Sequence, residues 1–326
     1  MIPRVTIANL PTPIESLERL SKALNGPTIF TKRDDLTGGL GFSGNKTRKL
    51  EFVLAEALAE GAKTLITVGS VQSNHCRQTA AFATRFGLDC ILVLFGQNPD
   101  EADGNLLLDS LFGAKVVWTE RERIHETLDR TFAETQAADK KPFLIPLGAS
   151  TPTGTLGYAF AMKELMEQGV DVETIVFASS SCGTQAGMVL GARLFGFSGK
   201  ILGISIDRNA ESMQKRIASL ASDASARFGE RIEFLPSEIF VNDEFNHAGY
   251  AVMGPLEEEA IRLFARTEGL LVDPVYTGRA AGGLIELIRR GEFVKGQKIL
   301  FWHTGGTPAL FAQPYEKLLQ DRTGAI

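Results

Sequence analysis

The chain has 326 residues, of which 44% are hydrophobic, so it can bury a large core, and its length predicts two domains. Its 34 basic and 39 acidic residues give a net charge of −5, and the sequence has no dense basic run interleaved with aromatic residues, which argues against a nucleic-acid partner. Charged residues interrupt every long apolar stretch, so we expect no contact with a membrane.

Cysteine and histidine usage indicates a reducing compartment and no metal site. The three cysteines, Cys76, Cys90 and Cys182, are widely spaced and form no Cys-x-x-Cys pair, and the chain start lacks the pattern of a signal peptide. We therefore expect a cytoplasmic protein. The four histidines include no His-x-x-x-His pair, so no metal ligands are expected.

Short β-rich runs alternate with helical patterns along most of the chain. The predicted strands are residues 64–68, 90–94, 115–118, 174–177, 201–206 and 299–302. The predicted helices include one that begins near residue 46 and ends at residue 61, and those over residues 74–86, 184–195, 256–266 and 279–290. This alternation, with nearly continuous apolar strands, predicts an α/β fold with parallel sheets flanked by helices.

The first of these helices places a lysine in an unusual position. Lys46 lies four residues before Leu50 and extends the apolar stripe of the helix, so its amine faces the interior near the positive end of the helix dipole. Both effects favour the neutral amine, which is the form that reacts with an aldehyde cofactor. A lysine that reaches water from a frayed first turn is the alternative, and this stretch alone does not decide between them.

Ligands of parallel sheets bind beyond the carboxyl ends of strands, where loops enter helices. The first such loop contains Ser73, which suits a helix N-cap, followed by Asn74 and His75, whose amides could hold a carboxylate. Taken alone, an ordinary serine cap is the better interpretation of this loop. A later loop, His303-Thr304-Gly305-Gly306, is a weak signal by itself.

The loop after residue 177 is better suited to phosphate. Three successive serines and Gly183 supply hydroxyls and open backbone amides ahead of a helix. Gly183, Gly187 and Gly191 are four residues apart, which allows that helix to lie close to a sheet or to a bound group. Close packing would explain the glycines but not the hydroxyls, so we favour a phosphate cup.

Two common phosphate motifs are excluded. A Walker A loop needs Gly, Lys and Ser or Thr in succession, whereas Asn45 separates Gly44 from Lys46. No G-x-G-x-x-G follows an early strand, so the dinucleotide fingerprint is absent from the sequence. A smaller phosphorylated ligand remains, and the buried lysine then indicates pyridoxal 5′-phosphate (PLP), whose aldehyde takes the lysine and whose phosphate takes the cup.

Several ordered blocks resemble the PLP-dependent family of 1-aminocyclopropane-1-carboxylate (ACC) deaminase and D-cysteine desulfhydrase. The blocks are Pro11-Thr12-Pro13, Lys32-Arg33-Asp34-Asp35, the runs 43–51 and 72–80, Thr184-Gln185-Ala186-Gly187-Met188, the run 273–278 and His303-Thr304-Gly305-Gly306. The resemblance covers nearly the whole chain. It implies a tryptophan-synthase-β-like (fold type II) enzyme and a homodimer. A small domain, 49–160, would be inserted in a large PLP-binding domain, 1–48 and 161–326.

The same resemblance implies roles for individual residues. Lys46 resembles the Schiff-base lysine. The loop that holds the substrate carboxylate and the cofactor's ring hydroxyl corresponds to Ser73, Asn74 and His75. The phosphate cup corresponds to Ser181, Cys182, Gly183 and Thr184. Two active-site tyrosines correspond to Tyr250 and Tyr276, for which packing in the core with a satisfied hydroxyl is the alternative.

Two departures from ACC deaminase bear on the reaction. Thr277 stands where those enzymes typically carry glutamate, and His75 where they carry glutamine. A neutral hydroxyl from Thr277 or Thr304 beside the pyridine nitrogen leaves the ring a weaker electron sink, which suffices for a good leaving group such as sulfide or sulfite. Both departures resemble the D-cysteine desulfhydrase branch, which includes L-cysteate sulfo-lyases.

The expected reaction is therefore α,β-elimination from a small sulfur-bearing amino acid, D-cysteine, to pyruvate, ammonia and hydrogen sulfide. The alternatives are L-cysteate and ACC as substrates. Arg77, Lys49 or Arg279 could serve a sulfonate, although a packing or solvated role is the default for each. A PLP carrier without catalysis is disfavoured, because it gives the tyrosines and the carboxylate loop no role.

Overall fold

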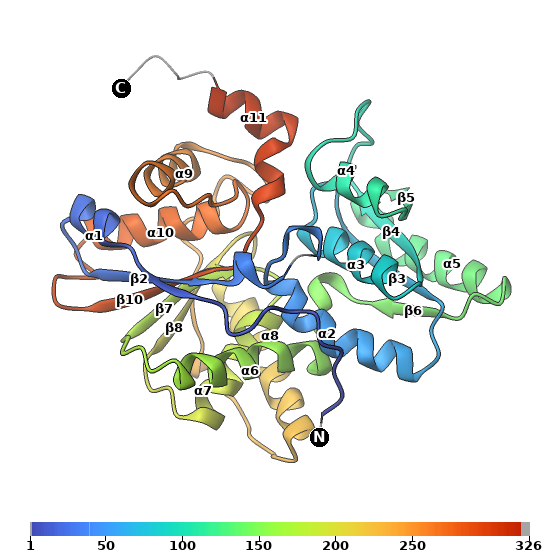
Figure 1. The fold of residues 1–326 in the computed structure, drawn as a ribbon, viewed down its shortest axis with the longest axis horizontal. Helices are drawn as coiled ribbons and strands as arrows, with labels where there is room; N and C mark the ends of the chain where they lie inside the picture. The colour runs from blue at the N-terminus through green and yellow to red at the C-terminus, as the bar shows by residue number, and fades with distance from the viewer. Residues whose placement is uncertain (1, 39, 321–326) are drawn as a thin grey trace.

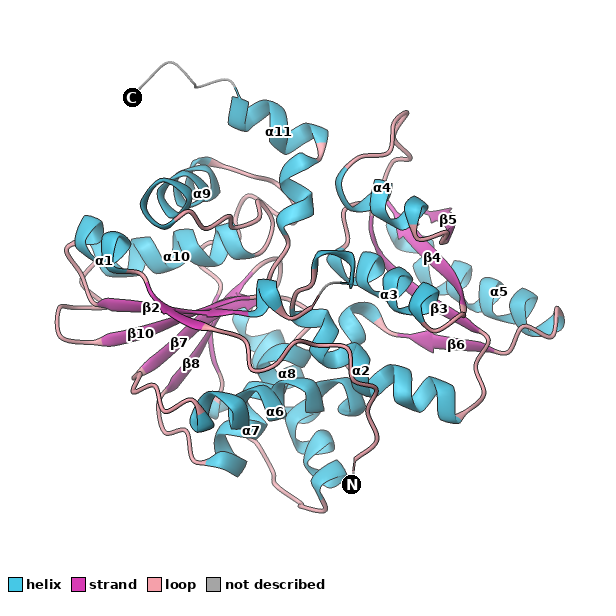
Figure 2. Ribbon diagram, viewed as in Figure 1, coloured by secondary structure: helices cyan, strands magenta, loops and turns pink. Residues whose placement is uncertain are grey.

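The computed structural model of the chain describes residues 2–38 and 40–320, which form two sheets with helices around them (Figures 1 and 2). The strands are β1 (Ile14–Ser16), β2 (Thr28–Arg33), β3 (Thr64–Ser70), β4 (Asp89–Phe95), β5 (Lys115–Thr119), β6 (Pro142–Ile145), β7 (Thr174–Ser179), β8 (Lys200–Ser205), β9 (Phe240–Asn242) and β10 (Lys298–His303). The helices are α1 (Glu18–Leu24), α2 (Asn45–Ala59), α3 (Asn74–Arg85), α4 (Gly104–Leu111), α5 (Ile124–Ala137), α6 (Pro152–Glu167), α7 (Gly183–Phe195), α8 (Ala210–Ser225), α9 (Pro255–Glu268), α10 (Thr277–Arg289) and α11 (Gln313–Gln320).

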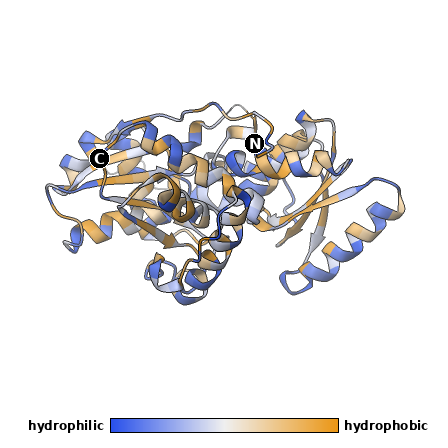
Figure 3. Ribbon diagram, turned by 90° about the horizontal axis from the view of Figure 1, so that it is seen from below, coloured by the Kyte–Doolittle hydropathy of each residue, from blue (hydrophilic) through white to orange (hydrophobic). Residues whose placement is uncertain are grey.

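Both sheets are dominated by parallel pairs. The larger sheet has the order β1-β2-β10-β7-β8-β9, in which only β1 runs antiparallel to its neighbour, and the smaller has the order β5-β4-β3-β6. The strands are mainly hydrophobic along their length, whereas the covering helices alternate hydrophobic and hydrophilic positions (Figure 3). Such strands need cover on both faces. The predicted α/β fold is thereby confirmed.

Helices α2, α6 and α7 lie between and beside the two sheets and touch backbone to backbone. A Cβ at Gly157 of α6 would lie 2.8 Å from the backbone nitrogen of Lys49 in α2, and one at Gly191 of α7 would lie 2.6 Å from the carbonyl oxygen of Ala159 in α6. The expectation that the α7 glycines face a sheet or a ligand is therefore wrong for Gly187 and Gly191, because their bare face packs against another helix.

The two proposed domain borders fall inside helices. The border at residues 48 and 49 divides α2, and the border at residues 160 and 161 divides α6, so neither coincides with a loop. The smaller sheet uses residues 64–145 only, which lie between these borders. The division into large and small domains stays a prediction. Within the described part of the chain, no helix combines the length and apolar character needed to cross a bilayer.

Candidate active site

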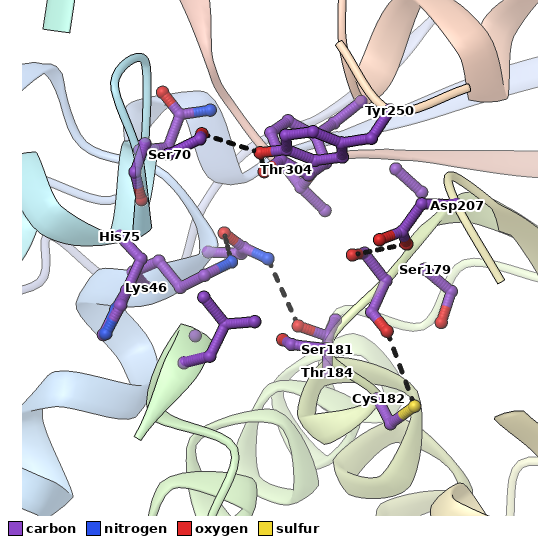
Figure 4. A pocket seen from close by; sticks show the side chains of 18 of the residues that line it. Lys46, Ser70, His75, Ser179, Ser181, Cys182, Thr184, Asp207, Tyr250 and Thr304 are labelled. Carbon is purple, nitrogen blue, oxygen red and sulfur yellow. Dashed lines mark hydrogen bonds between the residues drawn. The ribbon is translucent and has the colours of Figure 1, made fainter. Parts of the chain in front are cut away.

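One pocket collects residues from the carboxyl ends of strands in both sheets (Figure 4). Of the residues singled out from the sequence, it is lined by Lys46, Ser73, Asn74, His75, Ser181, Cys182, Thr184, Tyr250, Tyr276 and Thr304. Figure 4 shows Lys46 between Tyr250 at one end and the start of α7 at the other. Two candidates, Gly183 and Thr277, do not line it.

Lys46 is the second residue of α2, and its amine is hydrogen-bonded within the pocket wall. Nζ donates to Asn45 Oδ1 at 2.9 Å, and Asn45 Nδ2 donates to Thr184 Oγ1 at 3.2 Å, so the amide links the amine to the start of α7 (Figure 4). Burial, together with the charge of Arg77, lowers the pKa of Lys46 to about 8. A sizeable neutral fraction near pH 8 is what an imine-forming lysine needs.

Lys49 lies one turn further along α2 and is fully buried. Its Nζ donates to Gly148 O at 3.0 Å and to Ser150 Oγ at 3.4 Å, and no carboxylate of the described chain lies within ion-pair distance. Burial and the charge of Lys46 hold the pKa of Lys49 well below its usual range. Because protonating a buried amine that has no acid partner is costly, an anion beside Lys49 would favour its charged form. The sequence had given Lys49 a packing role.

The start of α7 is shaped as an open cup. Cys182, with φ 72°, holds a left-handed conformation that non-glycine residues rarely adopt, and the helix begins at Gly183. Gly183 N donates to Ser150 Oγ at 3.3 Å, and that hydroxyl donates to Ser181 Oγ at 2.9 Å. A Cβ at Gly183 would lie 2.8 Å from Lys49 Nζ and 3.0 Å from Ser150 Cα, so a side chain there would displace the lysine or Ser150. Ser150, which the sequence did not single out, completes this wall.

The loop at the start of α3 lines the pocket with Ser73, Asn74 and His75. Ser73 Oγ accepts from Cys76 N at 3.2 Å, which confirms the predicted N-cap. Asn74 Oδ1 accepts from Arg77 Nη1 at 3.0 Å and from Asn105 Nδ2 at 3.1 Å, so the Asn74 amide NH₂ is left to donate. Burial and the charges of Lys46 and Lys49 hold the pKa of His75 well below its usual range, so this imidazole is neutral.

Two tyrosines from the larger sheet's side form a hydroxyl chain that reaches the smaller sheet. The hydroxyls of Tyr250 and Tyr276 are 2.7 Å apart, and Tyr250 OH lies 3.0 Å from Ser70 Oγ at the end of β3. Burial raises the pKa of both phenols, so they stay neutral and can donate hydrogen bonds. The buried Arg279 fixes the Tyr250 loop, because it donates to Gly249 O and Val252 O at 2.9 Å each.

The two threonines differ in position. Thr304 lines the pocket, whereas the Thr277 hydroxyl is used within its own turn. Thr277 Oγ1 donates to Asp273 Oδ1 and accepts from Asp273 N, both at 2.7 Å. The expectation that Thr277 reaches a cofactor ring therefore needs correction, because its hydroxyl makes both bonds to Asp273 in the turn that leads into α10.

Comparison with known proteins decides the family. Residues 5–305 match the model of a family described as pyridoxal-phosphate dependent enzyme. The chain belongs to this family. Membership confirms the predicted cofactor, PLP, and the predicted enzyme class, a PLP-dependent lyase.

Solved structures agree with this assignment. A structure titled as an ACC deaminase homologue is 38% identical, with a TM-score of 0.88, and the match covers 98% of this chain and 95% of that one. Two further structures share the fold at 15% identity. They are the processed form of threonine deaminase isoform 2 from Solanum lycopersicum (TM-score 0.64, 92% of this chain and 80% of that one) and a lysine-to-alanine mutant of O-ureido-L-serine synthase with O-ureido-L-serine bound (TM-score 0.67, 98% and 92%).

The residues present fit PLP. Lys46 offers an amine of lowered pKa for the aldehyde. The cup at Gly183, with the unpaired Lys49 beside it, suits a phosphate dianion. The free NH₂ of Asn74 suits the ring hydroxyl, and the Thr304 hydroxyl is the threonine available to the ring nitrogen.

Proposed function

We propose that this enzyme catalyses α,β-elimination from D-cysteine to give pyruvate, ammonia and hydrogen sulfide. The observation that carries the proposal is the scarcity of carboxylates around the cofactor site. Among the described residues that line the pocket, Asp207 is the only acidic one, and its Oδ1 accepts from Ser180 Oγ at 3.0 Å. With a neutral threonine rather than a carboxylate for the ring nitrogen, the electron sink is weak, which favours a substrate with a good leaving group.

PLP, when bound, supplies an aldehyde for the substrate amine and a ring that accepts electrons from Cα. Ser73 and Asn74 orient the substrate carboxylate. Lys46, once displaced, removes the α-proton with an amine whose pKa of about 8 suits that task. Tyr276, a neutral phenol, donates a hydrogen bond that orients the leaving sulfur, and the hydroxyls of Tyr250 and Ser70 support it from behind.

The atoms balance without a redox partner. The Cα–H and Cβ–S bonds break, and sulfide leaves with the electron pair of the Cβ–S bond. The three-carbon enamine that remains takes up one water molecule and yields pyruvate and ammonia.

ACC deamination is the second candidate, because the solved structure that is 38% identical is titled as an ACC deaminase homologue. Opening a cyclopropane ring needs a stronger electron sink than expelling sulfide, and the one carboxylate in the described lining, Asp207, is hydrogen-bonded to Ser180. We therefore rank ACC behind D-cysteine. We also propose, from the sequence resemblance, that the enzyme is a cytoplasmic homodimer; sedimentation of the holoenzyme tests the dimer.

The test is product release from purified holoenzyme offered D-cysteine, L-cysteate, D-serine and ACC in parallel. Pyruvate and sulfide from D-cysteine would support the elimination. If 2-oxobutyrate forms from ACC and little pyruvate forms from the other three, the electron-sink argument is wrong and the enzyme is a deaminase.

A further inference from the structure

The side-chain oxygen of Asn74 is bound by an arginine that has no part in the chemistry described so far. Arg77 lies on α3, three residues after Asn74, and its second partner Asn105 lies on the neighbouring helix α4 (Figure 1). The sequence offered Arg77, Lys49 and Arg279 for a sulfonate, but none of the three is among the described residues that line the pocket, and that expectation is corrected here. Any effect of Arg77 on a bound ligand is therefore carried by the residues that it contacts or by its charge.

The guanidinium of Arg77 connects three segments around the pocket. It is fully buried, and its Nη1 donates to Asn74 Oδ1 at 3.0 Å and to Asn105 Oδ1 at 2.7 Å. Nη2 donates to the carbonyl oxygen of Ser43 at 2.9 Å, two residues before α2 begins. Because the guanidinium is planar and its donors have fixed directions, it holds the start of α3 against α4 and against the loop that leads to Lys46.

The same network sets which way the Asn74 amide points. Asn74 Oδ1 accepts from Arg77 Nη1 and, at 3.1 Å, from Asn105 Nδ2. Asn105 is fixed in turn, because its Nδ2 donates to Gln72 O at 2.9 Å and its backbone nitrogen donates to Gln72 Oε1 at 2.7 Å. Turning the Asn74 amide over would bring its NH₂ against two N–H donors, so the favoured orientation is the one that leaves the NH₂ to donate elsewhere.

The positive charge of Arg77 has no acid partner. Its three hydrogen-bond acceptors are neutral carbonyl oxygens, its Nε has no partner, and no carboxylate of the described residues forms an ion pair with it. Burial lowers the pKa of Arg77 only to about 10, so the guanidinium is charged at pH 7. A buried charge without a partner is costly, and an opposite charge nearby would offset this cost.

Asp109 could supply that opposite charge, but its surroundings oppose this. It lies one turn after Asn105 on α4, is fully buried, and neither of its carboxylate oxygens has a hydrogen-bond partner among the described residues. Burial raises the pKa of Asp109 to about 8 against the opposing effect of Arg77, so most of it is protonated at pH 7. The charge of Arg77 reaches the pocket, where burial and then this charge lower the pKa of Lys46. A negative charge on a ligand beside Asn74 would balance it.

We propose that Arg77 is a positioning residue for the cofactor: through Asn74 it directs an amide NH₂ to the ring hydroxyl, and its positive charge stabilises the ionised form of that hydroxyl. The hydrogen bond from Nη1 to Asn74 Oδ1 draws electron density from the amide, which makes the NH₂ a stronger donor. Asn105 supports the same oxygen from α4. The role depends on the PLP site at Lys46 and Asn74 and not on which amino acid is the substrate.

The ring hydroxyl of bound PLP reports on this charge without any amino acid present. Its ionised and protonated forms absorb at different wavelengths, so a pH titration of the holoenzyme gives the midpoint at which it takes up a proton. In Arg77→Gln, which keeps a polar donor but no charge, the midpoint should rise by about one pH unit or more. In Arg77→Lys, which keeps the charge but not the planar fork, it should rise by less than about half a unit. Equal rises in the two variants, or none in either, would overturn the role of the charge.

Arg85→Gln is the matched control. Arg85 is the last residue of the same helix, is exposed and does not line the pocket. Its substitution removes the same charge from α3 and should leave the midpoint unchanged. A shift as large as that in Arg77→Gln would assign the effect to the total charge of the protein and overturn the proposal.

Asn105→Ala tests the positioning apart from the charge. It removes one of the two bonds to Asn74 Oδ1 and keeps Arg77, so the Kd of PLP should rise about two- to tenfold while the midpoint moves less than in Arg77→Gln. An unchanged Kd would overturn the positioning role, and this variant carries the test if circular dichroism shows that Arg77→Gln does not fold. None of these measurements uses an amino acid, so absence of turnover with D-cysteine would overturn the proposed function and leave the role of Arg77 standing.

Discussion

Helix α2 carries buried cations on two sides, and the two sides differ in how the charge is balanced. On the lysine side, Lys46 lines the pocket, and Lys49, beside the cup, has only carbonyl and hydroxyl oxygens as partners. On the arginine side, Arg48 donates to Asp34 Oδ1 at 2.8 Å and to Glu164 Oε2 at 2.9 Å. Asp34 and Glu164 thus supply the negative charges that the lysine side lacks.

The difference separates a structural cation from a functional one. On the arginine side the acids offset the cost of burial, and Asp34 is held further by Tyr158 OH at 2.6 Å and Trp302 Nε1 at 2.8 Å. Although burial alone would raise the pKa of Asp34, the Arg48 charge keeps it below its usual range. On the lysine side the described chain offers no acid partner to Lys49, so the folded protein is prepared for an anion that arrives with the cofactor.

Lys46→Ala tests the lysine side of α2 and should have the largest effect on turnover. The variant should lose at least about 10⁴-fold in kcat, because the imine-forming amine is gone, while its fold stays intact. Pyruvate release and the absorbance of the bound cofactor measure both effects. Lys163→Ala, an exposed lysine on α6, is the control and should turn over normally. Near-normal turnover in Lys46→Ala would remove Lys46 from the mechanism.

Arg48→Met tests the arginine side. Removing one partner of a buried ion pair leaves Asp34 and Glu164 without their main counter-charge, so the free energy of unfolding should fall by about 3–5 kcal/mol. Urea unfolding of the apoenzyme measures the loss. Arg123→Met, which breaks a solvent-exposed pair with Glu126, should leave the free energy of unfolding nearly unchanged. Similar losses in the two variants would mean that the buried network adds nothing beyond a surface pair.

Lys49→Met, unlike Arg48→Met, should not lower the free energy of unfolding of the apoenzyme, and it should weaken PLP binding. The apoenzyme should be as stable as the unaltered protein or more so, because a buried amine without an acid partner is removed. The Kd of PLP should rise about 10- to 100-fold with the loss of a charge-assisted contact to phosphate. Equilibrium dialysis and urea unfolding give the two quantities. A variant with unchanged PLP affinity would assign Lys49 to packing.

The smallest expected effect is the pH dependence of the rate at which Lys46 forms its imine with PLP. With a pKa of about 8, roughly a tenth of Lys46 is neutral at pH 7 and about nine-tenths at pH 9, so the rate at which apoenzyme forms its imine with added PLP should rise about tenfold over this range. Stopped-flow absorbance measures the rate, and Lys46→Ala provides the blank. A midpoint near the ordinary lysine pKa of 10.5 would show that burial does not activate this amine.

The sequence predicted β3, β4, β5, β7, β8 and β10 and missed β1, β2, β6 and β9. The sequence did not predict β2, because its run ends in Lys32 and Arg33, which are residue types typical of solvent-exposed positions. In the fold Lys32 is fully buried and donates to Gln168 Oε1 at 2.6 Å and Thr12 O at 2.8 Å. A local pattern cannot reveal partners that are far away along the chain, and the short edge strands β1 and β9 leave little pattern at all.

The same limit applies to the site. Lys46, Ser73 and the serine-rich cup were recognisable because each lies where a strand or loop enters a helix, which is a local signal. Ser150 was missed because its position depends on which loops meet in space. Lys49 was recognised as a cation but not as a partner for phosphate, because the absence of an acid beside it among the described residues is visible only after folding.

The close contacts among α2, α6 and α7 set a practical limit for anyone who wants to redesign this enzyme. Gly157 and Gly191 leave no space for even one added methyl group, so substitutions there would shift the backbone of the lysine-bearing helix or of the helix that starts the cup. Libraries intended to change substrate range should therefore leave the three-helix block untouched.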